Sequence, residues 1–231
     1  MIRLGITGTD TGVGKTLVAC GIAAAFQQRG LRVTAMKPIE TGVTADDPLR
    51  DGARLSRAAR DARPLSALAP LTLPDPVAPL AAARRRATTI DLDALDLAVQ
   101  SASRGSDVLI VEGAGGLLVP ISERESFVTL FARWSLDLVI VAANRLGVIN
   151  HARLTCAAAR AAGLTVRAVV LNRVSTTNAD ASMDENGELI SELENVRVVE
   201  LPWTARPNDL ASVTVLCERS RLIEILSAGQ Q

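Results

Sequence analysis

The sequence of 231 residues is poor in aromatic side chains, with three Phe, two Trp and no Tyr, and its 25 basic and 25 acidic side chains leave no net charge. Nucleic-acid-binding proteins present basic surfaces, and those that bind single strands add aromatic platforms for stacking. The sequence lacks both features, so we expect no nucleic-acid partner. Its one basic cluster, Arg84-Arg85-Arg86, is more typical of a solvated helix face than of a phosphate-binding patch.

The sequence also has only three cysteines and one histidine. Cys20, Cys156 and Cys217 lie far apart among apolar residues, which indicates buried thiols and argues against a zinc site. No apolar run approaches the roughly 20 residues of a membrane span. A predicted strand begins at residue 2, which leaves no room for a signal peptide. We therefore expect a cytoplasmic protein with no membrane partner.

Apolar runs of the kind found in buried strands alternate with helical segments along the chain. Continuous Val, Ile and Leu runs separated by helices predict a mostly parallel sheet with helices on both faces. The length suits one domain, so we expect a single doubly wound α/β domain over residues 1–231. The expected strands are residues 2–7, 31–36, 107–111, 136–142, 165–171 and 196–201, and the expected helices are residues 17–28, 49–60, 91–103, 150–162 and 219–226.

Two segments show no periodicity of either kind. Residues 64–79 are rich in proline, which predicts an ordered loop or a wall of the active site. Residues 175–188 are polar, with Asn, Asp, Ser and Gly, which predicts a mobile segment.

The first predicted strand runs into a glycine-rich turn, GTDTGVGKT at residues 8–16, which leads into the first predicted helix. Glycines let backbone N–H groups close on phosphate oxygens, and a helix N-terminus adds partial positive charge. Lys15 can reach the β- and γ-phosphates, and the Thr16 hydroxyl can ligate Mg²⁺. The pattern departs from G-x-x-x-x-G-K-[ST] because Gly8 lies one residue early. We still expect a triphosphate-binding loop of the P-loop NTPase type rather than an ordinary strand-to-helix turn.

Two side chains at predicted strand ends are candidates for the same crevice, because α/β sheets bind ligands at the carboxyl ends of their strands. Glu112 ends its strand before four small residues, and it is the best candidate for a carboxylate ligand of Mg²⁺. Asp51 is a weaker candidate. Lys37 ends the second strand, where a cation can stabilise a transferring phosphoryl group. The alternative for Glu112 and for Lys37 is a solvated side chain at a strand end.

Five motifs together resemble those of dethiobiotin synthetase in order and spacing, over most of the chain. They are GTDTGVGKT at residues 8–16, KPIETG at 37–42, EGAGG at 112–116, LGVINH at 146–151 and the Pro-Trp pair at 202–203. The first and third motifs are shared with relatives such as the cobyrinic acid diamide synthases.

The resemblance implies an ATP-dependent ligase of biotin biosynthesis that requires Mg²⁺. The family converts 7,8-diaminopelargonic acid, CO₂ and MgATP to dethiobiotin, ADP and phosphate. One amine captures CO₂ as a carbamate, a carbamate oxygen attacks the γ-phosphate, and the second amine closes the ureido ring on the mixed anhydride. The family is homodimeric, and the tail of its substrate runs to the dimer interface.

The resemblance also implies roles for individual residues. The implied catalytic residues are Lys15, Lys37, Thr11 and Thr41, and the implied Mg²⁺ ligands are Thr16, Asp51 and Glu112. The implied nucleotide-binding residues are Gly12, Val13, Gly14, Lys15, Thr16, Leu17, Glu112, Gly113, Ala114, Gly115, Asn172, Pro202, Pro207 and Asn208, with Asn172 reading the adenine. The implied substrate-binding residues are Thr41, Leu146, Gly147 and Asn150, the last three binding the tail carboxylate partly across the dimer interface.

Some positions depart from the family pattern. Gly12, in the phosphate loop, stands where some members carry Glu, a change that bears on the loop and on nucleotide preference. Leu80 stands where some members carry His, in a stretch that the resemblance places at one wall of the substrate site. Thr41 stands where Ser is also found and keeps the hydroxyl, and Val148 is an apolar variation. His151 follows a helix start, where a single His is more often structural than catalytic.

Two other classes share parts of this pattern. Cobyrinic acid diamide synthase-like amide ligases are usually longer and carry a glutaminase domain with a nucleophilic Cys, for which this chain has no spare length. Partitioning-type P-loop ATPases are switches that carry a signature Lys where this chain has Asp10. Such a switch hydrolyses ATP without any diamine, so an assay separates the two.

Overall fold

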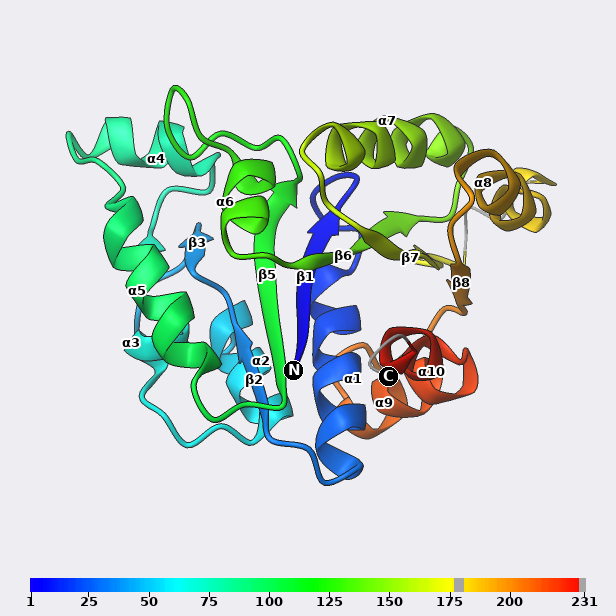
Figure 1. Cartoon of the computed structure of the whole chain (residues 1–231), viewed down its shortest axis with the longest axis horizontal. Coiled ribbons are helices and arrows are strands. Elements are labelled where there is room, and N and C mark those ends of the chain that lie inside the picture. Colours follow the sequence, from blue (N-terminus) through cyan, green and yellow to red (C-terminus); the bar gives the residue numbers. More distant parts are fainter. Residues whose placement is uncertain (177–180, 229–231) are drawn as a thin grey trace.

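A six-stranded parallel sheet forms the centre of the part of the chain described by the computed structural model, which covers residues 1–176 and 181–228 (Figure 1). The strand order is β2-β5-β1-β6-β7-β8, and every neighbouring pair is parallel. The strands are β1 (Ile2–Gly8), β2 (Val33–Met36), β5 (Val108–Gly116), β6 (Asp137–Ala143), β7 (Val166–Asn172) and β8 (Val198–Leu201). A separate parallel pair joins β3 (Ile39–Thr41) to β4 (Leu71–Leu73).

Helices cover both faces of this sheet, and among the described residues one apolar cluster lies beneath the first set and two lie beneath the second. The first face carries α1 (Lys15–Gln28), α2 (Asp51–Ala59), α9 (Leu210–Arg219) and α10 (Leu222–Ser227). The second carries α5 (Leu92–Ser103), α6 (Phe127–Arg133), α7 (Val148–Ala161) and α8 (Asn186–Glu194). Shorter elements are α3 (Leu65–Leu68), α4 (Pro79–Arg85) and the 3₁₀ helix η1 (Ala181–Asp184). The predicted fold class, a doubly wound α/β architecture with a mostly parallel sheet flanked by helices, is confirmed.

The alternation along β5 explains how the sheet aims a side chain at the first face. Val108 and Ile110 belong to the core beneath α1, whereas Leu109 and Val111 belong to the core beneath α5 and α6. Successive residues of a strand point to opposite faces. Glu112 is therefore in phase with Ile110 and points toward the side of the sheet that carries α1.

Several predicted boundaries were wrong. The helix predicted from residue 150 begins at Val148, because Gly147 takes a left-handed conformation and starts it. The helix predicted over 219–226 is divided between α9 and α10, because Arg221 has a φ of 62° and breaks the ladder. The strand predicted to end at residue 111 continues through Glu112 to Gly116, since Gly8 of β1 pairs with Gly116 across a bulge.

The segments predicted to be irregular contain short regular elements. The proline-rich stretch 64–79, predicted to be an ordered loop or a wall of the active site, holds α3, β4 and the first residue of α4 and is therefore not a loop throughout. In the polar stretch 175–188, residues 177–180 lie outside the described residues, while η1 and the start of α8 follow them. The strand β3 and the helices α6 and α9 were not predicted, because elements of 3, 7 and 10 residues are short for a period to be recognised.

Other sequence predictions concern single side chains. Cys20, Cys156 and Cys217 are buried free thiols, as predicted, and burial raises their pKa values to about 12, 11 and 12. Arg84 and Arg86 are exposed and pair with Glu123 and Asp75, which confirms a solvated helix face. Among the helices of the described residues, none has the length and apolar character needed to cross a membrane.

Candidate functional site

The glycine-rich loop connects β1 to α1 and leaves the start of α1 open to a ligand. Gly14 is the N-cap residue with a φ of 96°, and no side chain caps the helix. The first N–H groups of a helix have no partners within it, and together with the helix dipole they attract anions. The loop therefore has the geometry of a phosphate site.

Close packing around Gly14 allows no side chain there. A Cβ on Gly14 would lie 2.2 Å from Nδ2 of Asn172, at the end of β7. The same Nδ2 donates a hydrogen bond of 2.9 Å to the carbonyl oxygen of Val13. Asn172 thus holds the loop in place through a backbone group, in addition to its position on the cavity wall.

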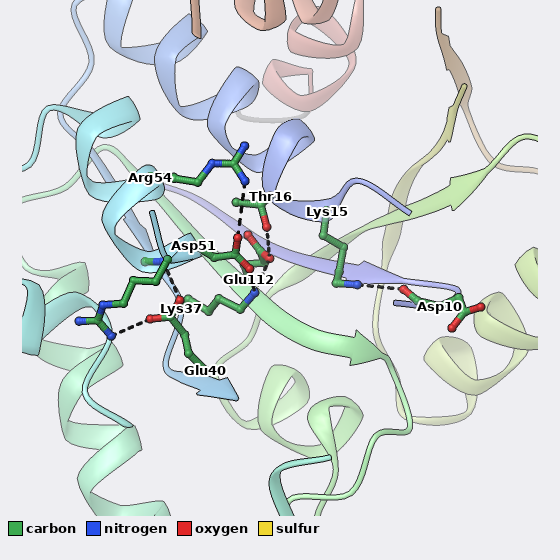
Figure 2. A network of polar contacts seen from close by, with 10 residues as sticks. Asp10, Lys15, Thr16, Lys37, Glu40, Asp51, Arg54 and Glu112 are labelled. Carbon is green, nitrogen blue, oxygen red and sulfur yellow. Dashed lines mark hydrogen bonds and ion pairs between the residues drawn. The ribbon is translucent and has the colours of Figure 1, made fainter. Parts of the chain in front are cut away.

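Lys15 folds back over the loop that precedes it (Figure 2). Its Nζ donates a hydrogen bond of 2.9 Å to the carbonyl oxygen of Asp10, and only 7% of the residue is exposed. Burial lowers the pKa of Lys15, although the Glu112 carboxylate opposes that shift. A poorly hydrated ammonium group gains more from an incoming phosphate than an exposed one does, because less solvation is lost.

Lys37 joins two carboxylates that come from different parts of the chain (Figure 2). Its Nζ lies 2.8 Å from Oε1 of Glu112, which is fully buried, and also donates to Oδ2 of Asp51 at the start of α2. The hydroxyl of Thr16 donates to the same Oε1 of Glu112 at 2.8 Å. The second and fifth strands and the first two helices thus bring four predicted site residues together. The solvated alternatives for Lys37 and Glu112 are wrong.

The charges in this cluster support one another. Burial alone would lower the pKa of Lys37, but Glu112 and Asp51 outweigh it and hold the pKa above its ordinary value. Burial alone would raise the pKa of Asp51, but Lys37 outweighs it and holds the pKa below its ordinary value. Lys37 and Asp51 therefore stay ionised near neutral pH.

The donor set fits Mg²⁺. Oε2 of Glu112 is buried and has no hydrogen-bond partner among the described residues, so it is an orphaned acceptor next to the loop. Thr16, Asp51 and Glu112 offer oxygen atoms, which Mg²⁺ prefers, and it commonly binds through one or two carboxylates plus substrate phosphates. No cluster of three His, Cys, Asp or Glu side chains within residues 1–176 and 181–228 could hold a metal by itself. The nucleotide would have to supply the remaining ligands.

A second buried ion pair, absent from our sequence predictions, borders this cluster. Arg50 Nη1 lies 2.8 Å from Oε2 of Glu40, and the other Glu40 oxygen accepts from the backbone N–H of Gly52 at 2.9 Å. Glu40 lies in β3 between the predicted residues Lys37 and Thr41, so the KPIETG motif contained it without indicating its role.

A cavity of about 740 Å³ extends from the loop past this cluster. Most of the predicted site residues line it: Thr11, Gly12, Gly14, Lys15, Thr16, Leu17, Lys37, Thr41, Asp51, Glu112, Ala114, Gly115, Asn172, Pro207 and Asn208. Lining residues that sequence reasoning missed are Glu40, Val43, Arg54, Val119, Arg173, Val174, Trp203 and Thr204. Segment 64–79 was also expected to form a wall of the active site, and Pro76–Pro79 do line this cavity.

Six predicted residues lie outside the lining. Val13 is a buried residue of the loop itself, and Gly113 packs against Phe127 and Phe131. Pro202 does not line the cavity, but its neighbour Trp203, the other residue of the Pro-Trp motif, does. The remaining three, Leu146, Gly147 and Asn150, are exposed around the start of α7.

The parallel sheet, the open loop ahead of α1 and the lysine–carboxylate cluster beside it define a P-loop nucleotide-binding protein. Residues 3–208 match a family described as an AAA domain. The ATP-dependent dethiobiotin synthetase BioD of Anaeromyxobacter sp. (strain Fw109-5) is 39% identical over 230 residues, covering 100% of this chain and 99% of that protein. BioD of Aquifex aeolicus (strain VF5) is 36% identical over 201 residues, covering 87% and 89%. The chain belongs to the dethiobiotin synthetase family and is an ATP-dependent ligase of biotin biosynthesis.

A solved structure is similar in fold alone. The MinC:MinD cell division protein complex of Aquifex aeolicus aligns with a TM-score of 0.55 at 15% identity, covering 98% of this chain and 93% of that one. At this identity the likeness shows a common architecture, because one fold serves many activities.

Proposed function

We propose that the protein converts 7,8-diaminopelargonic acid, CO₂ and ATP, with Mg²⁺, to dethiobiotin, ADP and phosphate. The observation that carries this proposal is Lys37, buried between Asp51 and Glu112 beside the phosphate loop. A simple nucleotide-binding loop needs Lys15 and Thr16 but no second buried lysine. A second fixed cation suits a reaction that first forms an anion from CO₂ and then phosphorylates it.

In the first step, the lone pair of one substrate amine attacks the carbon of CO₂, and the amine loses a proton, which leaves a carbamate anion. Lys37 has three N–H donors, of which the carboxylates occupy two. The third can bind the carbamate. The hydroxyls of Thr11 and Thr41 line the same cavity and can donate to the carbamate and its surroundings.

In the second step, a carbamate oxygen attacks the γ-phosphorus, and the bond from that phosphorus to the bridging oxygen of ADP breaks. Lys15 and the N–H groups at the start of α1 can stabilise the negative charge on the transferring group. Thr16, Asp51 and Glu112 would hold Mg²⁺, which supplies further charge neutralisation at the phosphates. The second amine then attacks the carbonyl carbon of the mixed anhydride, phosphate leaves, and the ureido ring closes with loss of a proton.

The substrate tail would leave the cavity toward the start of α7. Gly147 begins that helix in a left-handed conformation without a side-chain cap, so its N–H groups suit a carboxylate. Leu146, Gly147 and Asn150 are exposed and lie outside the cavity lining. A role for them in tail binding therefore fits a homodimer in which they serve the site across the interface.

The experiment that tests the proposed reaction measures ADP release with each component omitted in turn. We expect release only when bicarbonate, the diamine, ATP and Mg²⁺ are all present, and we expect mass spectrometry to identify dethiobiotin. A partitioning-type ATPase switch would turn over without the diamine. Substantial ADP release in its absence would overturn the proposal.

A further inference from the structure

The buried ion pair between Glu40 and Arg50 has no part in the proposed reaction steps. Its side chains are 2% and 3% exposed, and Nε of Arg50 is buried without a partner among the described residues. Burial raises the pKa of Glu40 even though Gly52 and Arg50 act to lower it. Buried ion pairs are a poor source of stability, because the cost of desolvation offsets their attraction. The position of this pair therefore calls for another explanation.

The pair lies at the start of α2, whose first residue is Asp51. One Glu40 oxygen accepts from the N–H of Gly52 at 2.9 Å, and the other accepts from Nη1 of Arg50 at 2.8 Å. Gly52 and Arg50 are the two neighbours of Asp51 along the chain. The carboxylate thus caps the helix from β3, in a place where the N-cap residue Arg50 provides no side-chain cap itself.

The fit around this cap is tight. A Cβ on Gly52 would lie 3.0 Å from Oε2 of Glu40 and 2.7 Å from Cβ of Ala69. Arg50 also donates to the hydroxyl of Thr72 in β4 at 3.2 Å, which ties the helix start to both short strands. The chain enters α2 through residues 42–50, which contain no helix or strand. Displacement of the Glu40 carboxylate would therefore shift the backbone of Asp51.

We propose that the Glu40–Arg50 pair is a positioning device that fixes Asp51 as a ligand for Mg²⁺ at the edge of the phosphate site. This inference rests on the proposed metal-binding role of Asp51. Glu40 and Arg50 act through the backbone on either side of Asp51, so they are positioning residues. Residues that orient metal ligands contribute to affinity because they hold the ligand in its binding geometry before the metal arrives.

The central test is Glu40→Gln. Glutamine keeps an oxygen for the N–H of Gly52 but removes the charge that faces Arg50. With ADP bound, the affinity for Mn²⁺ as a paramagnetic probe of the Mg²⁺ site, measured by electron paramagnetic resonance, should fall about 10- to 100-fold. The affinity for ADP in EDTA, measured by calorimetry, should stay the same because the phosphate loop is untouched. Arg50→Lys keeps a cation opposite Glu40 and should retain more Mn²⁺ affinity than Arg50→Met.

A matched control lies at the other end of the same helix. Asp61 pairs with Arg63 just beyond the last turn of α2 and is largely buried, but it is remote from Asp51 in the chain. Asp61→Asn should lower the melting temperature without changing Mn²⁺ affinity. If Glu40→Gln fails to fold, the double variant Glu40→Gln with Arg50→Met replaces it, because neutralising both partners leaves no uncompensated buried charge.

Asp51→Asn separates the inference from the proposed function. If Asp51→Asn leaves Mn²⁺ affinity unchanged, then the metal role of Asp51 is wrong and the inference falls with it. If Asp51→Asn weakens Mn²⁺ binding while the Glu40 variant lowers only the melting temperature, as Asp61→Asn does, then the pair is merely structural and the inference alone is overturned. Weaker Mn²⁺ binding in both Asp51→Asn and Glu40→Gln, with unchanged ADP affinity in EDTA, supports the inference.

Discussion

Lys37 and Glu112 are 75 positions apart in the chain, yet a hydrogen bond joins them inside the protein. Their pairing follows from the parallel register of β2 and β5, in which Met36 is opposite Val111. The next residue of each strand therefore emerges at the same edge of the sheet. Asp51 and Thr16 complete the cluster from the starts of two helices. At the residue scale, the site is a cluster in which the ammonium group of Lys37 is held between two carboxylates.

The first prediction concerns Lys37 itself. Lys37→Ala should lower kcat by about 10²–10³-fold, the usual loss when one preorganised charge donor is removed. ATP binding, measured by calorimetry, should be largely retained because Lys15 and the loop remain. The variant also leaves Glu112 buried without its cation, so circular dichroism must first show that it is folded at the assay temperature.

Lys15→Ala provides the contrast for Lys37→Ala. It should lose nucleotide affinity, because Lys15 belongs to the loop that closes on the phosphates. If nucleotide binding instead collapsed in Lys37→Ala as well, the separation of roles between the two lysines would be wrong.

At the scale of elements, the packing of the phosphate loop against β7 distinguishes glycines that the sequence motif does not. The glycine pattern predicts a loop whose backbone closes on phosphate, and the structure shows one of its glycines held against β7 and another with open space around it. A Cβ on Gly14 would collide with Asn172, whereas a Cβ on Gly12 would meet nothing within 4 Å, although both residues have positive φ. Of these two glycines, only Gly14 therefore lies against β7.

Gly14→Ala tests this contact. We expect it to weaken ADP binding at least about tenfold, because a left-handed alanine costs roughly 1–2 kcal/mol and the added methyl displaces Asn172. Gly12→Ala carries the backbone strain without the collision and is the control, measured by the same calorimetric titration. Equal losses in the two variants would show that backbone strain alone accounts for the effect.

A second prediction at this scale concerns the joint between α7 and α8. Glu194 is 6% exposed and pairs with Arg153 at 2.9 Å and with Arg160 at 2.5 Å. Burial would raise the pKa of Glu194, but hydrogen bonds from the two arginines hold it below its ordinary value of 4.5. The stability supplied by this carboxylate is therefore fully present above pH 4.5 and is lost as the pH falls through the lower pKa of the folded state.

Glu194→Gln should accordingly lower the free energy of unfolding at pH 7 by about 1 kcal/mol, the size of a charge-assisted hydrogen bond discounted for two half-exposed arginines. The difference from the unmodified protein should shrink as the pH falls below 4.5. Urea unfolding at several pH values measures this difference in the free energy of unfolding. Glu224→Gln, in an exposed pair with Arg221, should change nothing measurable. A difference that grew toward acid pH would contradict the expected loss of this stabilisation at low pH.

At the scale of the whole molecule, the sheet gathers the site at one edge and leaves other predicted residues at the surface. Leu146 is 78% exposed beside the start of α7, and Leu154 is 62% exposed further along that helix. An apolar surface of this kind, next to residues proposed to bind the substrate tail, suits the interface of a homodimer. That residues 1–231 form one domain stays a prediction at the same scale.

Sedimentation velocity tests the dimer. We expect the protein to sediment with twice the 24.3 kDa mass of one chain. Leu154→Glu should shift it to the monomer, because a charge buried at an interface without a partner is costly. Leu97→Glu, on α5 and equally exposed at 65%, is the control and should remain dimeric. A monomeric parent protein would contradict the homodimer, and a dimeric Leu154→Glu variant would place the interface elsewhere.

The sequence by itself determined the class of fold, the phosphate loop and most of the cavity lining. Long apolar runs reveal buried parallel strands, because such strands need apolar residues on both faces. Phosphate-binding loops use glycines at characteristic positions, so the local pattern at residues 8–16 can be recognised from the sequence without knowledge of any tertiary contact. The pattern could not reveal β3, β4 or α3, which are too short to show a period.

Only the tertiary structure decided which charges meet. The Glu40–Arg50 pair, the contact of Asn172 with the loop and the burial of Lys37 between two carboxylates all join residues from separate elements. The side-chain partners of such residues depend on strand register and on where a helix begins. Those positions are set by the packing of the whole sheet, which no local stretch of sequence contains.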